Sequence, residues 1–189
     1  SLATPVFESP DEASHLAVVR YFVVHRALPP ETIPSHRPMT GAEVAQSLAY
    51  HDPPLYYAPP LYYALAASLT AWIDMSDLPH LVVPSPSWEV GWAPQPNADP
   101  RSKNVYAHLA AKERVAKSGT VRAACVFRLF SIVLGATTVW CAHTLARSLW
   151  PDRPALALGA ATIIALNPQF IAISSGVTND GLLNALFSL

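Results

Sequence analysis

The sequence predicts an all-helical chain in which transmembrane helices follow a long loop that carries interfacial helices. Of its 189 residues, 51% are hydrophobic and only 13% are charged, about half the charged share of ordinary soluble domains. Charged residues are scarcest in the last third, where the apolar runs are long enough to cross a bilayer. We therefore expect a loop over residues 1–120 and transmembrane helices over residues 121–189.

The net charge bears on the partners of the chain, and the spacing of the two cysteines bears on whether they can form a disulfide. The net charge is −1 and no basic run is present, so nucleic acid is not expected as a partner. Cys125 and Cys141 fall in one predicted helix, about 24 Å apart, too far for a disulfide. The chain begins at Ser1 and stops at Leu189 inside an apolar run. We interpret it as an internal piece of a longer membrane protein.

The first predicted helix covers residues 11–26 and begins with an acidic pair. Ser9 suits the N-cap, Pro10 suits the first helical position, and Glu12 completes a capping box. The two prolines at positions 29–30 should end this helix. It is too short and too charged to span a bilayer, so we expect it to lie at the membrane surface.

A tandem repeat follows a second capping pattern, which predicts a short helix over residues 40–50. The repeat places Pro-Pro-Leu-Tyr-Tyr-Ala at residues 53–58 and again at 59–64. Its second copy opens a predicted helix over residues 60–73. The aromatic residues here fit a belt at the membrane interface, with core packing as the alternative; they are Tyr56, Tyr57, Tyr62, Tyr63 and Trp72.

The remaining chain contains the predicted spans. Residues 78–100 should be irregular, and residues 102–118 should form a hydrophilic helix that Gly119 ends. Three apolar helices are expected after it, at about 121–150, at 155–174 and from 179 onward. Pro168 should kink the second of them.

The side of the membrane follows from the order of the spans. Everything before residue 121 lies on one face, and the short turn at residues 150–154 lies on the other. Arg147 and Arg153 flank or lie in that turn, which favours the cytoplasm under the positive-inside rule. Four basic residues on the opposite side weaken this inference: Lys112, Arg114, Lys117 and Arg122. We still expect the first loop to be extracytoplasmic.

Several short motifs resemble a known family. They are residues 10–12 with His15, residues 59–63, residues 128–131, and residues 167–170 through 179–180. In this order they cover most of the chain and resemble polytopic glycosyltransferases of the GT-C class. The likeness is strongest to prokaryotic proteins related to the protein mannosyltransferases and the lipid A aminoarabinose transferases. The chain departs from that pattern because no apolar span precedes Ser1, which truncation would explain.

The resemblance implies a transferase of the prokaryotic plasma membrane. Its donor would be a sugar linked to polyprenyl phosphate, and its acceptor a lipid, a glycan or a protein on the outer face, next to membrane lipids. An acidic residue of the first outer loop would assist the acceptor. A positioned carboxylate can take the proton of a hydroxyl nucleophile, and the phosphate leaving group needs cationic stabilisation.

Asp11 is the first candidate for this base and Glu12 the second, because the capping box gives Glu12 a structural task. The alternative is that both acids merely cap the helix and interact with its dipole. His15 lies on the same helix face as Asp11. It could bind substrate, hydrogen-bond the acid, join a metal site, or lie at the interface. Two potential ligands are too few to assign a metal, so no cofactor is assigned and a divalent metal stays open.

Arg128 is the candidate for the donor phosphate, because a cation inside an apolar span is costly and usually functional. The alternatives are snorkelling toward the interface and a structural ion pair. Asn179 and Asp180 should reach the same membrane face as Asp11 and are candidates for substrate binding, although Thr178 and Asn179 both also suit a helix cap. The rival interpretations of the whole chain are a non-catalytic membrane protein, such as a lipid-binding or assembly subunit, and a transporter.

Overall fold

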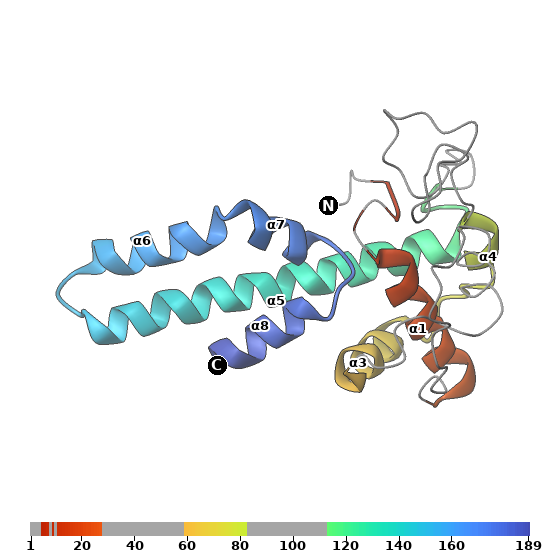
Figure 1. Cartoon of the computed structure of the whole chain (residues 1–189), viewed down its shortest axis with the longest axis horizontal. Helices are drawn as coiled ribbons and strands as arrows, with labels where there is room; N and C mark the ends of the chain where they lie inside the picture. Colours follow the sequence, from red (N-terminus) through yellow and green to blue (C-terminus); the bar gives the residue numbers. More distant parts are fainter. Residues whose placement is uncertain (1–4, 8, 10, 28–58, 83–112) are drawn as a thin grey trace, which may run out of the picture. The chain divides into compact units, whose positions relative to one another are not determined.

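A computed structural model describes residues 5–7, 9, 11–27, 59–82 and 113–189, and every regular element in these ranges is a helix (Figure 1). The predicted helix at 40–50 and the first tyrosine repeat lie outside the described residues. The helices are α1 (Glu12–His25), α3 (Pro60–Thr70), α4 (Leu78–Leu81), α5 (Gly119–Leu149), α6 (Pro154–Ala165), α7 (Pro168–Ser175) and α8 (Asp180–Ser188).

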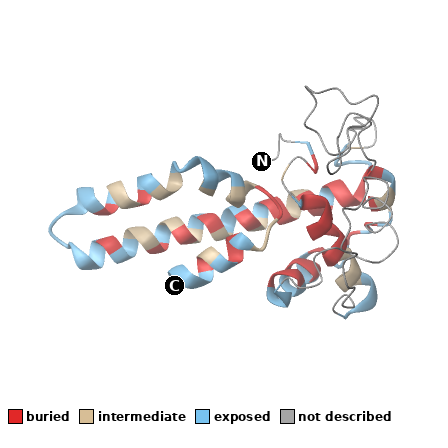
Figure 2. Cartoon of the chain, viewed as in Figure 1, coloured by how far each residue is buried: buried red, intermediate tan, exposed pale blue. Residues whose placement is uncertain are grey.

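The chain forms two compact units, which we name the N-terminal unit (Leu2–Val126) and the C-terminal unit (Phe127–Leu189). The core of the N-terminal unit lies where α1 packs against α3. Figure 2 shows the first half of α1 as continuously buried, from Glu12 to Val19. This half therefore packs in the core of the N-terminal unit, and its placement at a membrane surface stays a prediction.

Tyr62 and Tyr63 explain this burial. Each is 1% exposed and comes from the face of α3 that also buries Ala66 and Ala67. Small alanines between two large rings let the helices approach closely, and the rings supply the apolar area. The membrane belt was therefore the wrong interpretation for these two tyrosines, and core packing is the correct one. Trp72 is 72% exposed, and Tyr56 and Tyr57 lie outside the described residues.

The start of α1 differs from its predicted cap. Asp11, not Ser9, is the N-cap, and its backbone adopts the left-handed conformation with φ 58°. Arg26 is the C-cap of α1, and its backbone is also left-handed, with φ 51°. Its backbone N–H donates a hydrogen bond to the carbonyl of Phe22. Such a residue closes a helix by satisfying one of its last carbonyls. The chain thus leaves the helix before the prolines that were expected to end it.

Gly119 begins a helix instead of ending one. The described part of the expected hydrophilic helix, residues 113–118, is a turn, and α5 starts at Gly119. A Cβ atom at this position would lie 1.6 Å from the carbonyl oxygen of Asp74. The glycine is therefore required by a close approach between two distant segments, which a sequence pattern does not reveal.

Asp77 ties that same turn to the segment before α4. Its Oδ1 accepts hydrogen bonds from Thr120 N at 3.1 Å and Thr120 Oγ1 at 2.6 Å, and its Oδ2 accepts one from Ser118 Oγ at 2.5 Å. Partial burial acts to raise the pKa of Asp77, but the hydrogen bonds from Ser118 and Thr120 outweigh it and lower that pKa. Asp77 thus caps α5 from outside the helix, where a negative charge also favours the helix dipole.

Helix α5 has 31 residues and a length of about 46 Å, enough to cross a bilayer. It corresponds to the first predicted span. The second predicted span is a pair of helices, α6 and α7, bent by 62°. Asn167 caps α7, since its side chain accepts from Gln169 N at 2.9 Å and Phe170 N at 3.2 Å. The expected kink at Pro168 is therefore a full break. Within the described residues, one helix is long and apolar enough to span a membrane, or up to two candidates are counted if the bent pair is taken as one.

Helix α5 packs against α7 and α8 of the C-terminal unit. A Cβ at Gly135 would lie 2.6 Å from Ser174 Oγ of α7, and one at Gly181 of α8 would touch the Leu134 side chain at 3.9 Å. Small residues at such crossings let helix backbones approach, a device common in membrane proteins. Large apolar side chains point outward on this unit, including Ile163 at 75% exposure and Phe187 at 85% (Figure 2).

Candidate functional site

Asp11 lies exposed at the N-terminus of α1. Its carbonyl oxygen accepts the first helical hydrogen bond, from His15 N at 2.9 Å, while its side chain makes no capping hydrogen bond. Aspartate tolerates the left-handed backbone better than most residues. The carboxylate is thus presented to the surroundings at the positive end of a helix and is not used to build the helix.

Glu12 has the opposite environment. It is fully buried, and its Oε2 accepts a hydrogen bond from the backbone amide of Phe7 at 2.7 Å. Phe7 has φ 68°, an unusual backbone conformation for a bulky residue, so the buried acid fixes a strained segment. The predicted capping box, which pairs the side chains of Ser9 and Glu12 with each other's backbone, was wrong. The hydrogen bond between these two residues is a backbone one, which Glu12 N donates to the Ser9 carbonyl at 3.3 Å. The structural task expected for Glu12 is present, with Phe7 as its partner.

His15 is 6% exposed and faces α3. Its Nδ1 lies 2.8 Å from the hydroxyl of Tyr63, and the two rings stack with centroids 5.9 Å apart. The Tyr62 ring meets His15 edge-on at 6.5 Å. The histidine therefore links α1 to α3, which gives it a definite structural role one turn below Asp11.

Arg128 and Ser131 form a buried polar pair on one face of α5. Arg128 is 2% exposed, which disfavours the snorkelling alternative, and Ser131 is 0% exposed. Within the described part of the chain, Ser131 Oγ has no hydrogen-bond partner. Other hydroxyls of α5, such as that of Thr138, bond the carbonyl four residues earlier. Ser131 belongs to the motif of residues 128–131, and its helical spacing from Arg128 was the sequence signal that could have identified it as a functional residue.

Asn179 and Asp180 lie at the N-terminus of α8. Asn179 is the N-cap residue, but its side chain makes no capping hydrogen bond. Thr178 supplies one instead, because its Oγ1 accepts from Asp180 N at 3.3 Å. Asp180 is exposed in the first turn, where its charge favours the helix dipole. The helix cap that the alternative interpretation expected is therefore supplied by Thr178, and the Asn179 side chain takes no part in it.

The predicted site residues belong to two units. Asp11, Glu12 and His15 lie in the N-terminal unit, and Arg128, Asn179 and Asp180 lie in the C-terminal unit. A shared site that joins the two groups stays a prediction. Among the residues that the structure describes, no three His, Cys, Asp or Glu side chains gather as metal ligands would.

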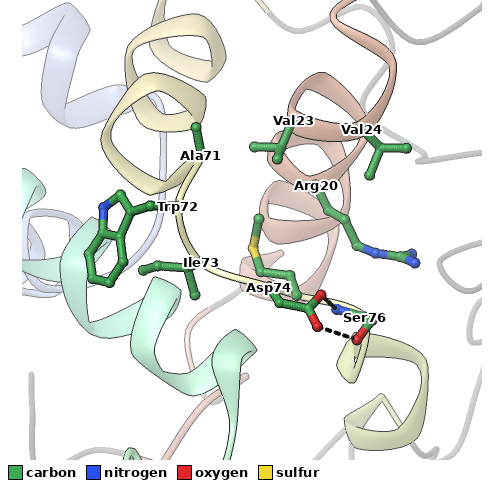
Figure 3. Close-up of a pocket in the computed structure, with 9 residues that line it drawn as sticks. Arg20, Val23, Val24, Ala71, Trp72, Ile73, Asp74 and Ser76 are labelled. Carbon is green, nitrogen blue, oxygen red and sulfur yellow. Dashed lines mark hydrogen bonds between the residues drawn. The ribbon is translucent and has the colours of Figure 1, made fainter.

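A pocket that the sequence did not reveal lies within the N-terminal unit. It has a volume of about 330 Å³ and is formed by the second half of α1 and the segment that joins α3 to α4 (Figure 3). Arg20 and Val24 line one wall, and Trp72 and Ile73 line the other. The pocket is amphipathic, with apolar walls and a single cation from α1.

Comparison of the chain with protein-family models, with curated protein sequences and with solved structures found no match.

Proposed function

We propose that this chain belongs to an integral membrane glycosyltransferase, in which Asp11 acts as the general base. The enzyme moves a sugar from a polyprenyl-phosphate donor to an acceptor on the outer face of a prokaryotic plasma membrane. The observation that carries the proposal is the contrast between two adjacent acids. Glu12 is buried and bonded to Phe7, whereas Asp11 is exposed and makes no capping hydrogen bond.

The reaction is a direct displacement at the anomeric carbon. The acceptor oxygen forms a bond to that carbon while the bond from the carbon to the phosphate oxygen breaks, so the configuration inverts. The acceptor proton passes to the Asp11 carboxylate, and polyprenyl phosphate leaves with the electron pair of the broken bond. A positioned base of this kind accelerates such a step by about 10²–10⁴-fold.

The leaving phosphate is assigned to Arg128 and Ser131. A guanidinium forms short, charge-assisted hydrogen bonds with phosphate oxygens, and a cation within a membrane span is usually functional. Ser131 adds a buried hydroxyl whose hydrogen-bonding capacity is unused within the described residues. Asn179 and Asp180, exposed or half-buried at the start of α8, are assigned to the sugar hydroxyls.

The membrane placement rests on α5, whose length and hydropathy are those of a membrane span. The basic residues near the turn between α5 and α6 favour a cytoplasmic position for that turn. Asp11 and the start of α5 then lie on the outer face. A lipid-linked donor is the appropriate substrate there, because its sugar is presented at the membrane surface.

The proposal is tested by measuring transfer from defined donors. Membranes that contain the protein are incubated with polyprenyl-phosphate hexoses and pentoses, each labelled in the sugar, and with the corresponding nucleotide sugars. We expect release of polyprenyl phosphate and labelling of an acceptor with one lipid-linked donor only. Absence of release from every lipid-linked donor, compared with membranes lacking the protein, would contradict the proposal.

A non-catalytic membrane protein is the second candidate, as a lipid-binding or assembly subunit. It is favoured by Glu12 and His15, both of which make structural hydrogen bonds inside the N-terminal unit. This candidate predicts that Asp11→Asn and Arg128→Ala leave the biological activity unchanged in any folded variant. The transferase proposal predicts the opposite for both substitutions.

A further inference from the structure

The pocket between α1 and the segment joining α3 to α4 is lined by residues that have no role in the proposed sugar transfer. Its walls include Val24, 61% exposed, and Trp72, 72% exposed. Large apolar side chains at such exposure are typical of a surface that contacts another molecule. Figure 3 shows Val23 and Val24 of α1 across the pocket from Trp72 and Ile73.

The pocket lining holds one cation, Arg20, and one acid, Asp74. Among the described residues, no hydrogen bond or ion pair engages the Arg20 guanidinium. The one acid in the lining, Asp74, is directed to Ser76, whose backbone N and Oγ both donate to it at 2.9 Å (Figure 3). A cation above apolar walls is complementary to a phosphate group that is attached to hydrocarbon.

An apolar stripe on α3 continues from the pocket. Its members are exposed by 39–72% and recur at helical spacing, so that they share one face of the helix; they are Leu61, Leu65, Leu69 and Trp72. The opposite face of α3 is the one that packs on α1. Helix α3 is therefore apolar on both faces, and a helix that is apolar all round is typically covered by protein or by lipid.

The pocket adjoins the first turn of α5 within the same unit. A Cβ at Gly119 would lie 1.6 Å from the Asp74 carbonyl oxygen and 3.7 Å from Ile73 Cγ2. Both Ile73 and Asp74 line the pocket. The inference thus rests on the membrane placement in the proposed function: if α5 spans the bilayer, its first turn and the pocket lie at the level of the lipid headgroups.

We propose that this pocket binds an anionic phospholipid of the bilayer. The lipid phosphate lies against Arg20, and the upper part of an acyl chain lies against Val24, Ile73 and Trp72. The bound lipid and the α3 stripe hold the N-terminal unit on the membrane surface, close to where α5 enters it. This site is separate from the donor site assigned to Arg128.

The experiment measures the depth of Trp72 by fluorescence quenching. The protein is placed in nanodiscs of phosphatidylcholine or phosphatidylglycerol that carry a spin label near the headgroup. The Trp72 signal is the difference between the parent and Trp72→Phe, and a reference signal comes from Trp140→Phe in α5. We expect stronger quenching of Trp72 by labelled phosphatidylglycerol than by labelled phosphatidylcholine.

Matched arginine variants test the phosphate contact. Arg20→Gln should lower the preference for phosphatidylglycerol about fivefold, as expected for one basic residue near an anionic surface. Arg147→Gln, at the other end of α5, should leave the Trp72 preference unchanged. Equal quenching of Trp72 by both lipids in the parent, or no effect of Arg20→Gln, would overturn the proposal.

Three further outcomes distinguish the phospholipid pocket from the proposed function. Quenching of Trp140 without quenching of Trp72 would contradict the phospholipid site alone. No quenching of either tryptophan would contradict the membrane placement and therefore the site that depends on it. Loss of Trp72 quenching when a few mole per cent of unlabelled polyprenyl phosphate is added would assign the pocket to that lipid and overturn the phospholipid assignment.

Discussion

The buried carboxylate of Glu12 accepts a hydrogen bond from the backbone amide of Phe7, with 2.7 Å between Oε2 and N. This bond fixes the chain just before α1, where Phe7 and Asp11 both have positive φ. The bond holds Glu12 inside the protein, whereas Asp11, the other acid of the pair, lies at the surface. The two acids should therefore respond differently to substitution.

Glu12→Ala should destabilise the N-terminal unit. It leaves the Phe7 amide without its acceptor in a buried site, which costs about 1–3 kcal/mol. Glu12→Gln retains a side-chain oxygen in place of Oε2 and should cost less. Denaturant unfolding of the three proteins measures the difference. A Glu12→Ala variant as stable as the parent would show that the hydrogen bond does not hold this segment.

Asp77 should make stability depend on pH in the acid range. Its pKa is lowered in the folded state, so its contribution is fully present above the ordinary value near 3.8 and is lost as the pH falls through the folded-state pKa. Asp77→Asn should cost about 0.5–2 kcal/mol at neutral pH, as for loss of a helix cap. The measurement is thermal unfolding of parent and variant at several pH values down to about 3. The difference should shrink in acid; a difference that is constant or grows in acid would be contrary to this account. Asp152→Asn, at an exposed turn, is the control and should change little.

Two helical glycines of the C-terminal unit should respond in opposite directions. A Cβ at Gly135 would lie 2.6 Å from Ser174 Oγ and 2.8 Å from Ser174 Cβ, whereas a Cβ at Gly159 meets nothing within 4 Å. Gly135→Ala should therefore separate α5 from α7 and cost about 1–3 kcal/mol. Gly159→Ala should be neutral or stabilising by about 0.5–1 kcal/mol, because alanine favours helices. Unfolding in detergent micelles compares them, and equal effects would refute the packing described for Gly135.

Ser131→Ala should separate binding from stability. The hydroxyl has no partner within the described residues, so its loss should leave the stability unchanged or raise it. If Ser131 donates to the donor phosphate, KM for the lipid-linked sugar should rise about 10-fold or more, as for a hydrogen bond to a charged group. The control is Ser148→Ala, an exposed serine of the same helix. An unchanged KM in Ser131→Ala would remove this residue from the phosphate site.

Elements set by local pattern were predictable from the sequence. The long apolar run predicted α5 to within two residues at each end, and Pro60 marked the first residue of α3. Pro168 announced an interruption of the second span, although the cap by Asn167 makes that interruption a 62° break. In each case the residues that decide the structure are neighbours in the chain.

Features that depend on distant contacts were not predictable. Gly119 was predicted to end a helix. A glycine is needed there because the Asp74 carbonyl, 45 positions earlier, approaches it closely, and the sequence pattern does not show this contact. His15 was predicted to act beside Asp11, on the same helix face. Its hydrogen-bond partner, Tyr63, lies 48 residues away in the sequence and could not be predicted. The candidate residues could be named from their chemical types. That Glu12 is buried while Asp11 is exposed became clear only from the structure.

The central claim is that Asp11 is the base, and sugar transfer by Asp11→Asn tests it most directly. Asparagine occupies nearly the same volume but cannot take up the acceptor proton. The account predicts that kcat falls about 10²–10⁴-fold while KM for the donor is nearly unchanged, with Asp152→Asn as the folded control that keeps the parent rate. Transfer by Asp11→Asn at the rate of the parent protein would contradict the account.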